Sequence, residues 1–75
     1  MTPAEAKNLT AMIGRLVEVE WCDEIGDWPY FILLEVCAED DTIRMQGADY
    51  PDKTAKHAGD CTWYDWREVR EITRV

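Results

Sequence analysis

The hydrophobic period of the sequence changes at Gly14, and this change most constrains the fold. Before Gly14, apolar residues recur at helical spacing, whereas the segment Val17-Glu18-Val19-Glu20-Trp21 alternates strictly between apolar and acidic residues. Side chains two positions apart share one face of a strand. We therefore predict a helix followed directly by a half-buried strand whose carboxylates face water.

The N-terminal segment carries the signals of a helix start. Thr2, Pro3 and Glu5 supply an N-cap, a proline in the first turn and the reciprocal carboxylate of a capping box. Apolar residues continue at helical spacing as far as Ile13, and Gly14 stands where a glycine commonly ends a helix. The pattern predicts an amphipathic helix over 3–13 that is stable only when docked on the rest.

The remainder of the chain predicts short strands separated by polar turns. The second strand is apolar on both faces, so we expect the helix or a partner to cover it. Between the third and fourth strands lies a polar segment with room for one helical turn at 52–57, and 67–69 is predicted to form a single 3-10 turn. The predicted strands lie at about 15–22, 28–38, 42–47, 61–66 and 70–75.

One helix followed by five short strands resembles the small SH3-like and Sm-like barrels. The segment Trp63-Tyr64-Asp65-Trp66-Arg67-Glu68-Val69-Arg70-Glu71-Ile72 is similar to the strand, turn and strand that close these barrels, and 28–38 with 42–47 to their long bent pair. The resemblance implies a single mainly β domain over 1–75, a five-stranded SH3-like or Sm-like barrel with a short N-terminal α-helix. The RNA site of the Sm family is not carried over, because Glu39-Asp40-Asp41 contains no Asn and the basic rim is missing.

The residue inventory argues against catalysis and metal binding. The chain contains no serine, which removes serine nucleophiles. Its one histidine, His57, lies in a polar segment typical of solvated surface. Cys22, Cys37 and Cys61 could join His57 in a zinc site, but they lack the close CxxC pair of structural zinc sites. We therefore expect no catalytic residues, no metal and no cofactor.

The same inventory bears on the cellular environment. An odd number of cysteines with no secretory signal suits a reducing compartment, so we expect a cytoplasmic protein. No apolar run reaches the roughly 18 residues of a membrane span.

The distribution of charge is the most informative functional feature. The 75 residues carry a net charge of −8, yet residues 16–43 contain nine acidic residues and no basic one. The first two strands and their turns are neighbours in a barrel, so we expect one continuous acidic face. The alternative is that the excess charge serves solubility alone. The carboxylates predicted to bind a partner are Glu18, Glu20, Asp23, Glu24, Asp27, Glu39, Asp40 and Asp41.

The aromatic residues are too numerous to be buried together. Alternation places Tyr64 and Trp66 on the face opposite Trp63. We therefore expect partial exposure of at least one tryptophan, the candidates being Trp28 and either Trp63 or Trp66. An exposed Trp beside charges is typical of an interface hot spot, and Trp28 is the predicted anchor.

These features favour a small acidic, non-enzymatic interaction module. It would dock its acidic face on a basic protein surface, such as that of a nucleic-acid-binding protein or complex, without binding nucleic acid or membranes itself. In size and charge it is similar to phage proteins that disable restriction or CRISPR complexes by imitating nucleic acid. One alternative is an Sm-like or Tudor-like reader of nucleic acid or peptide that uses Tyr30, Tyr50 and Trp66 for stacking. The other is a structural or oligomerisation domain whose second strand pairs with its copy in a homo-oligomer.

Overall fold

The capping signals form the predicted helix, which ends earlier than expected. The computed structural model describes residues 1–22, 28–49, 54–55 and 61–75, and α1 spans Pro3–Thr10. The Thr2 side chain accepts a hydrogen bond from the Glu5 N–H (3.1 Å), and the Glu5 carboxylate accepts one from the Thr2 N–H (2.7 Å). The helix ends at Thr10 rather than at 13, because Met12 and Ile13 donate to carbonyls only three residues back. Gly14 then turns the chain at φ +84°.

The prediction of a mainly β chain with five antiparallel strands and one N-terminal helix is confirmed for the described residues. A two-residue strand, β4, was not expected. The sequence left room for one helical turn at 52–57. This is wrong at 54–55, which form β4, and the rest of 52–57 lies outside the described residues. Pairing with β4 also explains why β3 runs beyond 47. The strands are β1 (Leu16–Trp21), β2 (Tyr30–Cys37), β3 (Thr42–Asp49), β4 (Thr54–Ala55), β5 (Cys61–Asp65) and β6 (Val69–Arg74).

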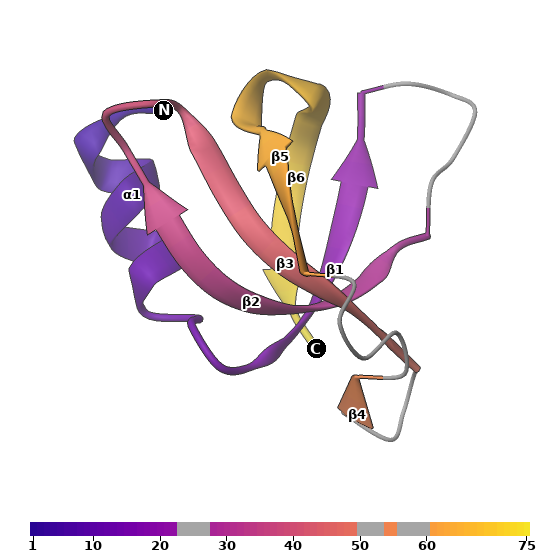
Figure 1. The fold of residues 1–75 in the computed structure, drawn as a ribbon. Helices are drawn as coiled ribbons and strands as arrows, with labels where there is room; N and C mark the ends of the chain where they lie inside the picture. Colours follow the sequence, from indigo (N-terminus) through magenta and orange to yellow (C-terminus); the bar gives the residue numbers. More distant parts are fainter. Residues whose placement is uncertain (23–27, 50–53, 56–60) are drawn as a thin grey trace.

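The strands form one curved sheet. Its order is β4-β3-β2-β1-β6. β5 also pairs with β3, along the edge of β3 opposite to β2. A single 3-10 turn, η1 (Trp66–Glu68), joins β5 to β6 (Figure 1), and these two strands stand at opposite ends of the strand order β5-β3-β2-β1-β6. It begins one residue earlier than predicted, because the Asp65 side chain caps it by accepting from the Arg67 N–H at 2.9 Å. The sheet therefore bends around an enclosed core.

The core follows the alternation of β1 and its neighbours. Val17 and Val19 of β1 are buried, and their partners across the sheet include Phe31 of β2 and Ile72 of β6. Leu9 is the buried residue of α1, and it joins the same cluster. The helix thus contacts β2 and contributes to the core, as expected from the apolar character of that strand. Burial of this cluster supplies the main driving force for folding.

Two adjacent leucines of β2 test this arrangement. Leu33 is fully buried, whereas Leu34 lies at an irregularity in the pairing of β2 with β3 and is only half-buried. We expect Leu33→Ala to lower the free energy of unfolding by about 2–5 kcal/mol, the usual cost of a core cavity. Leu34→Ala serves as the matched control and should cost clearly less. Chemical denaturation of both variants measures the difference, and equal losses would contradict the register of β2.

Candidate protein-interaction surface

The residues predicted to bind a partner fall in separate parts of the fold. Asp23, Glu24 and Asp27 lie outside the described residues. Glu18 and Glu20 lie on β1, with Trp28 just before β2, while Glu39, Asp40 and Asp41 form the turn between β2 and β3.

The carboxylates of β1 face outward because their neighbours occupy the core. Glu18 and Glu20 are exposed on either side of the buried Val19. The register places Glu18 opposite Tyr30 of β2, and Glu20 opposite Glu71 of β6. Directly opposed residues of antiparallel strands project to the same face of the sheet. We call the outward surface formed by Glu18, Glu20, Tyr30 and Glu71, together with Trp28, the carboxylate face.

Trp28 is an ordered yet exposed aromatic residue at this face. Its side chain is 49% exposed, and its indole Nε1–H donates to the Ala48 carbonyl at 2.8 Å. The ring meets Tyr30 edge-on, with centroids 6.0 Å apart. The Trp28 carbonyl in turn accepts from the indole N–H of Trp21 at 3.2 Å. The predicted exposure of Trp28 is therefore confirmed. Contacts within the chain fix the orientation of its indole ring.

The carboxylate face is less uniformly negative than the sequence suggested. Arg70 of β6 lies 3.3 Å from Glu20, although fifty positions separate the two residues in the chain. Glu20 is thus opposed by a cation, contrary to the expectation from the acidic run. Both side chains are more than half exposed, so solvent screens the pair and it contributes little to stability. Within the described part of the chain, Glu18 and Glu71 have no ion-pair partner.

The three acidic residues of the β2–β3 turn have different environments. Asp41 adopts φ +58°, and its carboxylate pairs with the Met1 ammonium group. Its carbonyl accepts from the Trp66 N–H at 2.8 Å, so Asp41 is held in the turn from both sides. Asp40 accepts a hydrogen bond from the Cys37 thiol at 3.5 Å, while Glu39 is exposed. Asp41 therefore has a structural role, and Glu39 and Asp40 remain available to a partner.

A groove beside this turn was not predicted from the sequence. It has a volume of about 530 Å³, and one wall is Trp63 of β5, which is 47% exposed. Trp63 lies opposite Arg44 of β3, which is itself opposite Glu35 of β2 and forms an ion pair with it at 3.5 Å. The sequence contained one indication of this groove. Side chains alternate along β5, so Trp63 was expected on the face opposite Tyr64. The lining residues are Glu35, Val36, Cys37, Asp40, Thr42 and Trp63.

The turn η1 separates the two groups of described carboxylates. On one side the Trp66 N–H binds the Asp41 carbonyl, and on the other the Glu68 carbonyl accepts from the Cys22 N–H at 2.9 Å. Between them, Arg67 pairs with Asp65 at 2.7 Å. Of the carboxylates predicted to bind a partner, the described ones therefore lie in two groups, on β1 and in the β2–β3 turn, with η1 and its Asp65–Arg67 ion pair between them.

The Asp65–Arg67 pair makes the turn sensitive to acid. Hydrogen bonds from the Arg67 side chain and backbone lower the pKa of Asp65 from 3.8 to about 2. A carboxylate with a lowered pKa in the folded state stabilises the fold above its unfolded pKa, and this contribution is lost as the pH falls through the folded value.

We expect Asp65→Asn to be destabilising at pH 7, and the difference from wild type to shrink between pH about 5 and about 2. Thermal unfolding across this pH range measures it. Glu39→Gln is the control, because Glu39 has no ion-pair partner within the described segments, and it should differ little from wild type throughout. A constant Asp65→Asn difference down to pH 2 would contradict the ion pair.

The cysteines do not gather into a metal-binding cluster among the described residues. Cys22, Cys37 and Cys61 carry free thiols, and His57 lies outside the described residues. No cluster of three or more His, Cys, Asp or Glu residues able to hold a metal occurs among the residues that the structure places.

The stacking residues of the reader alternative do not form one platform among the described residues. Tyr30 lies at the carboxylate face, Trp66 packs against the core, and Tyr50 lies outside the described residues. Of the described cations near these residues, Arg44, Arg67 and Arg70 each pair with a carboxylate.

No helix in the described segments is long and apolar enough to cross a bilayer. No family model, curated protein or solved structure matches the chain.

Proposed function

We propose that this chain is a non-enzymatic protein-interaction module that docks its carboxylate face on a basic protein surface. Trp28 is the anchor of the contact, and Glu18, Glu20 and Glu71 supply its charge. The acidic turn at Glu39 and Asp40 provides a second, separate contact on the other side of η1. Asp23, Glu24 and Asp27 complete the acidic set that the sequence assigns to binding.

The observation that carries this proposal is the position of Trp28 against Tyr30, the residue that lies opposite Glu18. Trp28 is half-exposed although its indole N–H is hydrogen-bonded and its ring packs on Tyr30. Tyr30 lies directly opposite Glu18, which has no ion-pair partner in the described structure. A rigid aromatic residue loses little conformational entropy on binding, and adjacent charge gives orientation and a fast association rate.

We extend to the fold the resemblance to SH3-like and Sm-like barrels. The support is the strand order β6-β1-β2-β3-β5 and the single turn η1 between the last two strands. In this arrangement β2 lies between β1 and β3, so its backbone is already paired over residues 30–33. This pairing disfavours self-association through β2 and favours binding through side chains on the sheet surface.

The partner class that fits is a protein with a groove rich in lysine and arginine. Glu18 and Glu20 are two residues apart on one strand face, a spacing of about 6.7 Å. Regularly spaced carboxylates can occupy a groove built for phosphates, so the proposed activity is inhibition of a nucleic-acid-binding protein by imitation of its ligand. A phage-type inhibitor of restriction or CRISPR complexes is the form of this proposal that the size and charge suggest.

The test is affinity capture of a partner from a nuclease-treated lysate of the native host, followed by binding kinetics with that partner. We expect Trp28→Ala to weaken binding by about 2 kcal/mol or more, mainly through faster dissociation. Glu18→Gln should slow association at low salt, because it removes an unpaired charge from the face.

Ala11→Lys is the matched control for Glu18→Gln. Both substitutions raise the net charge by one, but Ala11 is exposed at the end of α1. Equal association rates for the Glu18→Gln and Ala11→Lys proteins would show that only overall charge matters, and that result would overturn the proposed face. Capture of nucleic acid in place of a basic protein would favour the reader alternative.

A further inference from the structure

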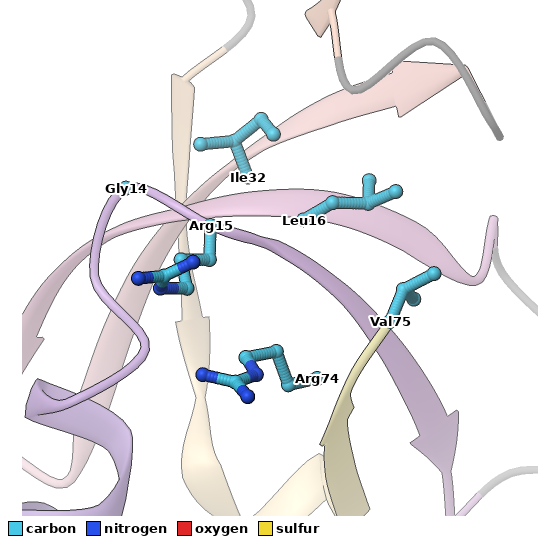
Figure 2. Close-up of a pocket in the computed structure, with 6 residues that line it drawn as sticks. All are labelled: Gly14, Arg15, Leu16, Ile32, Arg74 and Val75. Atoms are coloured by element: carbon cyan, nitrogen blue, oxygen red, sulfur yellow. The ribbon is translucent and has the colours of Figure 1, made fainter.

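A pocket with two arginines lies between the start of β1 and the end of β6. Figure 2 shows Arg15 and Arg74 extending their guanidinium groups to the same side of the strand pair, while the Leu16 and Ile32 side chains extend in other directions. The register explains this proximity, because Arg74 lies opposite Val17, two residues after Arg15. The pocket has a volume of about 270 Å³ and is lined by Gly14, Arg15, Leu16, Ile32, Arg74 and Val75.

These two arginines differ from the other described arginines in having no carboxylate partner. Arg44, Arg67 and Arg70 each form an ion pair, whereas neither Arg15 nor Arg74 does so within the described residues. The chain has twice as many acidic as basic residues, so an unpaired arginine is unexpected, and two in one pocket more so. Two neighbouring cations repel each other, and an anion between them converts this repulsion into attraction.

Backbone hydrogen bonds fix the pocket before a ligand binds. The Gly14 N–H donates to the Leu33 carbonyl at 2.7 Å, and the Leu33 N–H donates to the Arg15 carbonyl at 3.3 Å. On the other side, the Val75 N–H donates to the Leu16 carbonyl at 3.2 Å. Both arginines therefore project from backbone that is held by its neighbours. Gly14 has φ +84°, and a Cβ at this position would meet no atom within 4 Å, so the approach to the pocket is open.

The chemistry of the lining selects a small oxyanion. Guanidinium groups offer planar pairs of N–H donors that match phosphate oxygens, and two of them balance a doubly charged anion. Leu16 and Ile32 also line the pocket, and Arg15 and Arg74 are both exposed, so an anion reaches them from solvent. The volume is slightly below that of pockets for drug-sized ligands, which fits a phosphate group with a small substituent. The net charge of −8 opposes a polyanion such as nucleic acid at this position.

We propose that Arg15 and Arg74 form a binding site for phosphate or a small phosphate monoester. Its lining residues Leu16 and Ile32 lie two positions from Glu18 and Tyr30 on β1 and β2, so the site adjoins the carboxylate face. In Figure 1 the C-terminal end of β6 and the connection from α1 to β1 lie at the opposite end of the molecule from η1 and the β2–β3 turn.

The experiment is an NMR titration of the whole chain with inorganic phosphate at constant ionic strength, with glycerol 1-phosphate and acetate as parallel arms. We expect saturable shifts of the backbone resonances of Gly14, Arg15 and Leu16. Arg15→Gln and Arg74→Gln should each lower the affinity for phosphate roughly tenfold or more, because a charge-assisted hydrogen bond is lost. Tighter binding of glycerol 1-phosphate than of phosphate would identify the monoester as the preferred form, and the reverse would identify the free ion.

Two controls separate this site from general attraction to positive charge. Lys7→Gln removes an exposed, unpaired cation on α1, and Arg70→Gln removes an arginine already paired with Glu20. Both should leave the phosphate affinity unchanged within about twofold, and the spectrum of each variant shows whether it is folded. The proposal is overturned by shifts that do not saturate, by equal binding of acetate, or by an equal loss of affinity in the Lys7→Gln protein.

Discussion

The alternation of apolar and acidic residues along β1 is the constraint on which the rest of the structure depends. Val17 and Val19 are buried, and β1 lies between β2 and β6. Because side chains alternate along a strand, Glu18 and Glu20 face solvent. A shift of one residue in this strand would place two carboxylates in an apolar core, at a large cost in free energy. The same register sets Glu18 opposite Tyr30 and Glu20 opposite Glu71. The composition of the outer surface therefore follows from the packing of the inner one.

Tertiary structure redistributes the charge that the sequence concentrates. Glu20 acquires Arg70, Asp41 acquires the Met1 ammonium group, and Glu35 acquires Arg44. The Glu20–Arg70 and Glu35–Arg44 pairs are exposed and add little to stability, whereas the Asp41–Met1 pair is part-buried. All three reduce the field around the first two strands. What distinguishes the carboxylate face is therefore its combination of unpaired carboxylates with an ordered, half-exposed tryptophan. Negative charge alone would not distinguish this face from the β2–β3 turn, which also carries carboxylates.

Local patterns in the sequence were sufficient for the parts of the structure that depend on near neighbours. The capping box at Thr2 and Glu5 and the outward direction of Glu18 follow from spacing and alternation. The number of aromatic residues predicted at least one exposed tryptophan, and Trp28, one of the candidates, is exposed. The ion pair of Glu20 could not be predicted, because it requires knowing that β6 lies beside β1 in a particular register. The pocket at Arg15 and Arg74 was missed for the same reason, since Arg15 immediately precedes β1 and Arg74 ends β6. The helix was predicted too long because helical spacing continues past the point where the chain tightens into a turn.

The central claim is that binding to cationic partners is localised at the carboxylate face. The most direct measurement is an NMR titration of the chain with a short arginine- and lysine-rich peptide at low salt, following the indole N–H signals of all four tryptophans and the backbone signals of β1 and the β2–β3 turn. The account predicts the largest shifts at the Trp28 indole and at Glu18, with smaller shifts at Glu39. Shifts of equal size at every acidic segment, with the Trp28 indole unaffected, would contradict it.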